Sequence, residues 1–233
     1  MRKKTIHPIL FFFLIHSAIL SNVAACEETT VMDWHTRNLP FRVLNTTSVA
    51  PSLWICGTDE SVAVSSDAGE HWQVKHKATD GAVLLNIGFA NDKFGYAAGT
   101  GGLFLTTEDG GETWFPHSAG KDAILQVSFS DAKHGLIRTF TSLLFSVDGG
   151  ANWLIVSSRQ NSEDIKRFPY TFSLVALDST HMEVMMKEGS AHYEPQAFLF
   201  TTDSGMSWKF LAIPNVTLYS FLRVHGKYWA VGD

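Results

Sequence analysis

The segment Thr107-Glu108-Asp109-Gly110-Gly111-Glu112-Thr113-Trp114 is the clearest of four similar eight-residue repeats in this chain of 233 residues. The other copies occupy residues 65–72, 146–153 and 201–208, and all four follow the pattern S/T-x-D-x-G-x-x-W. We call these copies boxes 1 to 4 in chain order. An aspartate can accept hydrogen bonds from backbone N–H groups of a turn, and glycine can adopt the positive φ that many turns need. Each box therefore predicts a hairpin corner, after which the tryptophan starts the next strand as a buried anchor.

Three residues of each box are assigned a structural role. They are Asp67, Gly69 and Trp72; Asp109, Gly111 and Trp114; Asp148, Gly150 and Trp153; and Asp203, Gly205 and Trp208. A calcium loop needs several oxygen ligands at close spacing, whereas the pattern guarantees one carboxylate per box. We therefore expect no metal, no cofactor and no catalytic residue at the boxes.

The spacing of the boxes predicts the architecture. Consecutive box aspartates are separated by 42, 39 and 55 positions. A period of roughly 40 residues with several short strand-like runs is typical of a β-propeller blade. In the second unit we expect four strands, at residues 83–89, 95–99, 103–107 and 113–117. The predicted fold class is all-β, a propeller of four-stranded antiparallel blades.

The box pattern resembles the Asp-box, or BNR repeat, of β-propeller proteins. That repeat occurs in sialidases, xyloglucanases, sortilin-type receptors and assembly factors. The resemblance therefore implies the architecture and leaves the activity open.

Residues 1–25 are predicted to be an export signal. Arg2, Lys3 and Lys4 precede an apolar core at residues 9–20, and small residues follow. The string Val23-Ala24-Ala25-Cys26 resembles a bacterial lipobox, in which Cys26 would carry lipid; simple cleavage at a small-residue site is the alternative. We expect an exported protein, in the periplasm or anchored to an envelope membrane as a lipoprotein, with secretion as the alternative.

The two ends of the chain are interpreted through blade closure, in which an N-terminal strand completes the last blade. Residues 33–38 are expected to be that closing strand, and residues 219–224 and 227–232 repeat the first two strands of a blade. The period places the next box aspartate at about position 242, beyond Asp233. We expect residues 31–233 to be an incomplete propeller, truncated from a seven-bladed ring, with four box-containing blades and a partial one. A five-bladed ring that lacks one strand is the alternative.

The charge of the chain bears on its partners. A net charge of −5 and the lack of a basic run in the sequence argue against nucleic acid. We expect contact with a membrane only through lipid at Cys26, and a monomeric chain. The sequence contains no H-E-x-x-H, C-x-x-C or G-x-S-x-G motif, and its glycines fit turns better than a phosphate-binding loop.

Binding residues are expected on the propeller face opposite the boxes, on loops held by the rigid blades. Two connections on that face, residues 157–169 and 187–195, are longer than the repeat requires. The candidate binding residues are Arg138, Arg159, Arg167, His192 and Tyr193. The alternative for these residues is a solvated loop charge or an ion pair between blades.

Arg138 is a candidate because it stands ten residues before Asp148, where two other blades have glycine. An arginine at the end of such a strand can bind a carboxylate through two hydrogen bonds. The following hairpin is one residue shorter in this blade, so Thr139 is the alternative equivalent of those glycines.

The unit from Gly95 to Trp114 is similar to blades of the photosystem II stability/assembly factor family, which carry an aromatic-apolar-Gly strand followed by T-x-D-G-G-x-T-W. The resemblance extends over residues 33–233. It implies a non-enzymatic, seven-bladed, chaperone-like factor that binds a precursor reaction-centre subunit through an arginine-rich patch. Arg138, Arg159 and Arg167 are the arginines available for such a patch. The leading hypothesis is an exported binding or scaffold module with a protein partner in the cell envelope.

A sialidase-like glycoside hydrolase is the alternative, because Phe41-Arg42-Val43-Leu44 partly resembles the sialidase motif F-R-I-P. That chemistry needs three arginines around the substrate carboxylate, a Tyr–Glu nucleophile pair and an aspartate as acid/base. Arg42, Asp59 and Tyr193 are available, but Leu44 replaces the proline and the sequence shows no identifiable arginine triad. We expect no enzymatic activity.

Overall fold

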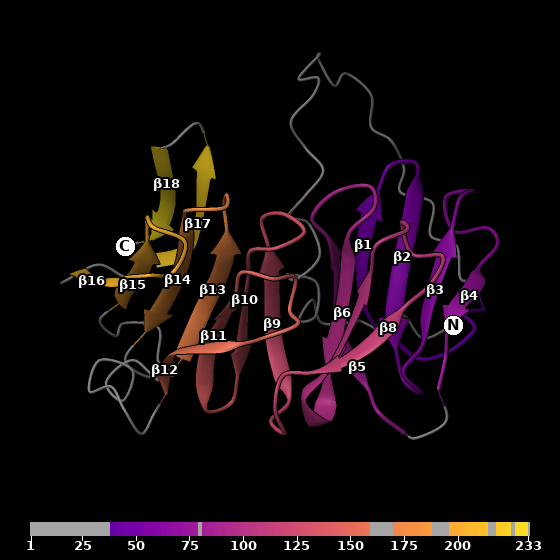
Figure 1. Cartoon of the computed structure of the whole chain (residues 1–233). Helices are drawn as coiled ribbons and strands as arrows, with labels where there is room; N and C mark the ends of the chain where they lie inside the picture. The colour runs from indigo at the N-terminus through magenta and orange to yellow at the C-terminus, as the bar shows by residue number, and fades with distance from the viewer. Residues whose placement is uncertain are drawn as a thin grey trace, which may run out of the picture. The chain divides into compact units, whose positions relative to one another are not determined.

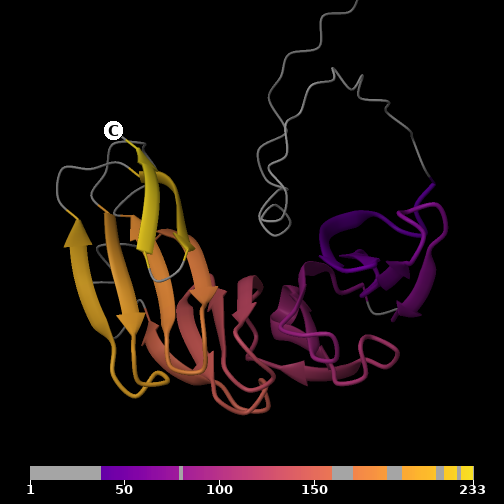
Figure 2. The same cartoon turned by 90° about the horizontal axis from the view of Figure 1, so that it is seen from above.

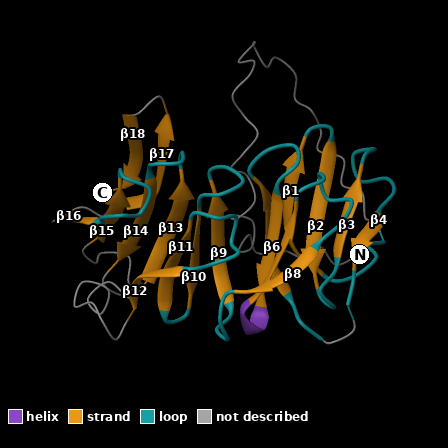
Figure 3. Ribbon diagram, viewed as in Figure 1, coloured by secondary structure: helices purple, strands orange, loops and turns teal. Residues whose placement is uncertain are grey.

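The computed structural model describes residues 38–78, 81–158, 170–187, 196–213, 218–224 and 227–232. Apart from Asn38, these residues belong to one compact unit, 39–233. They form β-strands joined by loops and one 3-10 turn, η1 (Thr100–Gly102) (Figure 3). Among the described residues, no helix is long and apolar enough to cross a membrane.

Four consecutive sheets contain four strands each, and we number them sheets 1 to 4 (Figure 1). Sheets 1 and 2 consist of β1 (Val43–Val49), β2 (Ser52–Gly57), β3 (Val62–Ser65) and β4 (Gln73–His76), and of β5 (Leu84–Phe89), β6 (Gly95–Gly99), β7 (Leu103–Thr107) and β8 (Phe115–Ser118). Sheets 3 and 4 consist of β9 (Ile124–Phe129), β10 (Gly135–Thr139), β11 (Ser142–Ser146) and β12 (Leu154–Ser158), and of β13 (Tyr170–Ala176), β14 (Met182–Lys187), β15 (Gln196–Thr201) and β16 (Lys209–Ile213).

The strands of each sheet follow one another in chain order and pair antiparallel. Each box connects the third strand to the fourth. A further antiparallel pair, β17 (Leu218–Val224) and β18 (Lys227–Gly232), follows sheet 4 in the chain. This repeated up-and-down sheet is the unit from which propellers are built.

The strand predictions for the second unit are confirmed, with a one-residue difference at the start of the first strand and at the end of the fourth, and a larger difference at the start of the fourth. β8 begins at Phe115 rather than at Thr113, because the Thr113 N–H donates to the Asp109 side chain at 2.9 Å and is not available for pairing with β7. The two strands expected at 219–224 and 227–232 are also present, as β17 and β18. Of the predicted closing strand 33–38, only Asn38 is described, and it does not lie in a strand.

Apolar side chains fill the spaces between neighbouring sheets. The cluster between sheets 1 and 2 consists of Trp54, Cys56, Val62, Leu84, Ile87, Ala97, Leu105 and Trp114. The cluster between sheets 2 and 3 consists of Phe94, Tyr96, Ala98, Phe104, Ile124, Phe129, Ile137 and Leu144. The cluster between sheets 3 and 4 consists of Leu136, Leu143, Phe145, Ala176, Met182, Val184, Ala197 and Leu199. Each sheet is thus held by its neighbours, as in a repeat architecture whose units cannot bury their faces alone.

The first strands of consecutive sheets contact one another, β1 with β5, β5 with β9, and β9 with β13 (Figure 2). Each of these first strands has a bulge, in which one residue has no partner in the neighbouring second strand. The residue directly after the bulge is polar, as in Asn45 of β1 and Asn86 of β5. Asn45 Nδ2 donates to Leu85 O at 3.1 Å, and Asn86 Nδ2 donates to Leu125 O at 3.2 Å. These bonds satisfy carbonyls that the bulge removes from regular pairing, and they link one sheet to the next.

Three box glycines pack directly on an aromatic ring of the preceding sheet. A Cβ at Gly111 would overlap the ring of Trp54, one at Gly150 would overlap Phe104, and one at Gly205 would meet Phe145 at 2.6 Å. The glycines also have φ values of 92°, 88° and 82°, which disfavour residues with a Cβ. The box therefore requires glycine for the turn and for contact between sheets.

Candidate functional site

The four boxes share one hydrogen-bond pattern. In box 2, Thr107 Oγ1 donates to Asp109 Oδ1 at 2.8 Å and accepts from the Gly111 N–H at 2.8 Å. Asp109 in turn accepts from the backbone N–H and the hydroxyl of Thr113. Corresponding bonds link Ser65, Asp67 and His71; Ser146, Asp148 and Asn152; and Thr201, Asp203 and Ser207. Each carboxylate is therefore used to close its own corner.

These hydrogen bonds lower the pKa of the box aspartates. The hydroxyl of Thr113, its backbone N–H and the hydroxyl of Thr107 lower the pKa of Asp109 to about 2. Ser207 and Thr201 act in the same way on Asp203, whose pKa is also about 2. Burial raises the pKa of Asp148, but its hydrogen bonds outweigh that effect and the net shift is downward. These bonds favour the charged form, so the carboxylates stay ionised to a lower pH than a free aspartate does.

Acid is expected to destabilise the fold through the box aspartates. Their pKa in the folded chain lies below the unfolded value of about 3.9, so their contribution to stability is complete above that value and is lost as the pH falls towards about 2. The measurement is the free energy of unfolding as a function of pH across this window. Asp109→Asn removes one titrating carboxylate, and its stability should vary less with pH than that of the wild type. An unchanged pH dependence would contradict this role of Asp109.

The turns between first and second strands lie at the same end of the sheets as the boxes. The Gly110 N–H donates to Lys93 O, the Gly149 N–H to Lys133 O and the Ser204 N–H to Thr180 O, at 2.9 to 3.1 Å. We call this end, with the four boxes and the turns at residues 90–94, 130–134 and 177–181, the box face. In sheets 2, 3 and 4 a backbone bond thus links the box to the neighbouring turn.

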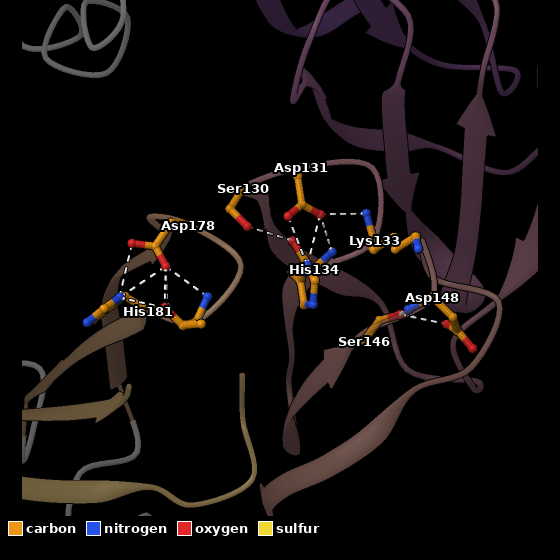
Figure 4. A network of polar contacts seen from close by, with 9 residues as sticks. Ser130, Asp131, Lys133, His134, Ser146, Asp148, Asp178 and His181 are labelled. Atoms are coloured by element: carbon orange, nitrogen blue, oxygen red, sulfur yellow. Dashed lines mark hydrogen bonds and ion pairs between the residues drawn. The ribbon is translucent and has the colours of Figure 1, made fainter. Parts of the chain in front are cut away.

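Two Asp–His pairs occupy neighbouring turns of the box face (Figure 4). Asp131 accepts from the backbone N–H groups of Lys133 and His134 and contacts His134 Nδ1 at 2.9 Å. Asp178 makes the same arrangement with Thr180 and His181. Burial opposes ionisation of both aspartates, but the hydrogen bonds prevail and lower their pKa. Both carboxylates are therefore committed to holding their turns.

The opposite end of the sheets, which we call the loop face, carries the second-to-third-strand hairpins at residues 58–61, 100–102 and 140–141. These hairpins are bonded to the connections between consecutive sheets. The Glu60 N–H donates to Ala82 O at 2.9 Å, and the Ala119 N–H donates to Gly102 O at 3.0 Å. Thr141 Oγ1 donates to Asp122 Oδ2. The loop face thus presents hairpins that are fixed in place.

The hairpin of sheet 3 differs from those of sheets 1 and 2. Thr139 Oγ1 accepts from the N–H groups of Ser142 and Thr141, at 3.0 and 3.3 Å, and so closes a short turn. Phe140, at its tip, is 59% exposed. The corresponding tips of sheets 1 and 2 carry Asp59 and the glycines of η1, so among the three described hairpins Phe140 is the only large apolar side chain at a tip. An exposed aromatic side chain on a hydrogen-bonded turn is suited to anchor a partner, because aromatic side chains supply a large contact area at a low cost in conformational entropy.

The strand register decides between Arg138 and Thr139 as the equivalent of the strand-end glycines. Thr139 lies opposite Ile124, just as Gly99 lies opposite Leu84, and each pair precedes the extra residue of the first strand. Arg138 therefore occupies the position of Ala98, which packs between sheets 2 and 3. Arg138 is partly buried, and its strand β10 lies beside β13 of the next sheet. That Arg138 binds a carboxylate stays a prediction.

The other candidate residues lie outside the described residues. These are Arg159, Arg167, His192, Tyr193 and the lipidation candidate Cys26. Cys56, by contrast, is described and fully buried, and its Sγ lies 3.7 Å from Leu84 O. Burial raises the pKa of its thiol to about 12, which makes it an unreactive packing residue. Within the described ranges, no three His, Cys, Asp or Glu side chains are grouped so that they could hold a metal ion.

Sequence reasoning missed several polar contacts of the loop face and of the sheet interfaces. Glu60 is buried and its carboxylate contacts His76 Nε2 at 3.1 Å, which ties the hairpin of sheet 1 to β4. Asn45 and Asn86 recur at the same place in consecutive first strands, so alignment of those strands was a signal that could have identified them. The shortened hairpin was visible in the sequence, but the exposure of Phe140 at its tip was not, because exposure depends on how the turn is folded.

No protein-family profile matches the chain. A curated relative, the chloroplastic photosystem II stability/assembly factor HCF136 of Arabidopsis thaliana, is 30% identical over 139 residues, which cover 55% of this chain and 31% of the relative. The solved structure of YCF48 from Cyanidioschyzon merolae superposes with a TM-score of 0.58 at 16% identity, over 85% of this chain and 69% of that one. The fold is that of a β-propeller.

A second solved structure, YCF48 bound to D1 peptide, is 24% identical and superposes with a TM-score of 0.45, over 64% of this chain and 46% of that one. The chain thus resembles the photosystem II assembly factor HCF136 over part of its length. It spans about a third of the length of that curated relative.

Proposed function

We propose that this protein is a non-enzymatic propeller module that binds a protein partner and assists its assembly. The observation that carries the proposal is the 30% identity to a photosystem II stability/assembly factor over 139 residues. The distribution of polar contacts supports it, since the box-face carboxylates close their own turns while the loop face carries rigid hairpins and an exposed aromatic side chain. Function then resides in loops on a rigid scaffold, as is common for repeat folds.

The proposed partner surface is the loop face of sheets 3 and 4. It includes Phe140 and Arg138, together with the candidates Arg159, Arg167, His192 and Tyr193. Aromatic residues and arginines are both enriched at the centres of protein interfaces. The ligand class suggested by the relatives is a polypeptide, since one similar structure is described as bound to a D1 peptide.

The proposed setting is the cell envelope. Residues 1–25 have the sequence features of a signal peptide, and residues 31–233 would form the exported propeller. Lipid at Cys26 would hold the module at a membrane, close to membrane-protein partners during their assembly; without lipid, the module would be periplasmic or secreted. We propose a monomeric chain, without cofactor and without nucleic acid.

Site-specific photo-crosslinking in cells tests the proposed function. A photo-reactive phenylalanine analogue replaces Phe140 on the loop face or, as the control, Phe115 on β8, which has a similar exposed fraction of 56%. We expect a discrete protein adduct from position 140 and none from position 115, because the two side chains differ in location and not in accessibility. Equal labelling from both positions, or adducts from position 115 alone, would contradict the proposed surface.

Enzyme assays separate the alternative function from this one. We expect the purified chain to leave a fluorogenic sialoside intact. Hydrolysis that is abolished by Arg42→Ala would instead favour the sialidase-like alternative.

A further inference from the structure

The outer edges of the four sheets are protected unequally. The fourth strands β4, β8, β12 and β16 each end their sheet, and each is hydrogen-bonded on one side within the described part of the chain. An open strand edge can pair with another polypeptide, and native proteins block it with lysine, other charges or proline. Three of these strands contain such a residue, namely Lys75 in β4, Pro116 in β8 and Lys209 in β16. β12, with the sequence Leu-Ile-Val-Ser-Ser, contains none.

The apolar half of β12 is also exposed. Leu154 and Ile155 are 55% and 60% accessible to solvent. Val156 is an extra residue relative to β11 and packs against the core between sheets 3 and 4, whereas the two exposed residues are adjacent in the strand and lie on its opposite faces. β4 also has an extra residue relative to its partner strand, and that residue is Lys75. The register irregularity is therefore common to both strands, and what distinguishes β12 is that it contains no charged residue.

Box 4 extends this apolar edge. In the first pair of sheets, Glu112 of box 2 reaches over β4 and binds Lys75 Nζ at 2.7 Å. The corresponding residue of box 4 is Met206, which is 86% exposed. Gly205 packs on the ring of Phe145, and Phe145 is paired with Leu154, so box 4 lies against the same part of β12. An ion pair at one sheet interface is therefore replaced by exposed apolar side chains at another.

We propose that β12 accepts an extended, uncharged segment of a partner protein as a fifth strand of sheet 3. This inference rests on the proposed function and adds a second contact to it. The main chain of the segment would bond to the open edge of β12, and its alternating side chains would contact Leu154 and Met206 on one face and Ile155 on the other. A charged segment is disfavoured because β12 offers no counter-charge.

The size of the strand favours a peptide segment over a second copy of the chain. Two copies joined through five residues each would bury much less than the about 1,200–2,000 Å² found in stable protein interfaces. Strand addition by a short extended segment works through main-chain hydrogen bonds and a few side-chain contacts, and does not need a large flat surface. The chain is therefore expected to stay monomeric when β12 is open.

A phage-displayed library of random linear peptides, selected on the purified full chain, tests the inference. We expect enriched peptides to alternate apolar and uncharged residues and to lack proline. Their affinity should fall about tenfold or more for Ile155→Lys and stay at the wild-type level for Ile155→Val. Leu211→Lys on β16 is the matched control, because Leu211 is 56% exposed on an outer strand that already has a lysine, and it should not change affinity.

The contradicting outcomes are distinct from those of the proposed function. Enriched peptides that bind Ile155→Lys as tightly as the wild type would overturn the role of β12. A dimer seen by analytical ultracentrifugation and abolished by Ile155→Lys would also overturn it, since the occupant would then be a second copy. If the adduct from position 140 persists in either case, the proposed function stands; if that adduct and the peptide binding both fail, the two proposals fall together.

Discussion

Gly111→Ala is expected to destabilise the fold by about 2–5 kcal/mol. Gly111 has a φ of 92°, and a methyl group there would overlap the ring of Trp54 in the preceding sheet. The backbone conformation alone should cost about 1–2 kcal/mol, and displacing a packed ring should add about 1–3 kcal/mol. The substitution therefore strains one box and loosens the contact between sheets 1 and 2.

Gly101→Ala separates these two contributions. Gly101 also has a positive φ, of 69°, but no atom lies within 4 Å of the position its Cβ would take. It should lose only the conformational part, about 1–2 kcal/mol. The measurement is the free energy of unfolding from urea titrations followed by far-ultraviolet circular dichroism. Equal losses in the two variants would show that the contact with Trp54 does not contribute.

Phe104→Ala is expected to destabilise the fold by about 3–5 kcal/mol, the range for deleting a buried aromatic side chain. Phe104 is fully buried between sheets 2 and 3, stacks on Phe129 at 5.9 Å between ring centroids and meets Trp153 edge-on at 5.3 Å. Its ring also lies beneath Gly150 of box 3. The resulting cavity would remove contacts from two sheets and from one box.

Phe115→Ala is the matched control for Phe104→Ala. It removes the same atoms from an outer strand, where more than half of the side chain is exposed, and should cost less than about 1 kcal/mol. Both values come from the same urea titrations. If Phe115→Ala destabilised the chain as much as Phe104→Ala, burial between sheets 2 and 3 would not account for the effect of Phe104→Ala.

Local chemistry made the sheets predictable from the sequence. The residues of each box act on their own turn, as when Thr107 and Asp109 bond to the backbone within four positions. Strand positions followed from the same repeat, and β6 and β7 have the expected bounds. The start of β8 was wrong by two residues, because the reach of the aspartate side chain to Thr113 competes with strand pairing.

Contacts between sheets were not predictable in the same way. The ring beneath Gly111 belongs to Trp54, more than fifty positions earlier in the chain, and sheets 2 and 3 use Phe104 and Phe145 from a different strand of the sheet. The pattern requires only that some ring fill the space, so it does not specify which residue does so. Likewise, the sequence left Arg138 and Thr139 as alternatives, and strand register was needed to assign Thr139 to the glycine position.

Candidate sites were less predictable still. Recognition depends on which side chains remain exposed after the sheets have formed, and Phe140 and β12 stand out only when exposure and edge pairing are known. The charged residues on the long loops were also candidates, but no local sequence pattern fixes their role in the way that the box pattern fixes the role of its aspartate. Their selection rested on loop length and charge, which many solvated loops share.

Hydrogen–deuterium exchange tests the division between the box face and the loop face most directly. It compares the full chain alone with the chain bound to the protein captured from position 140. We predict slower exchange on binding at the amides of residues 139–142, with exchange at the box amides of Gly111 and Thr113 unchanged, because the boxes lie at the opposite end of the sheets from the proposed surface. Protection confined to the boxes, with the hairpins of the loop face unaffected, would contradict the account.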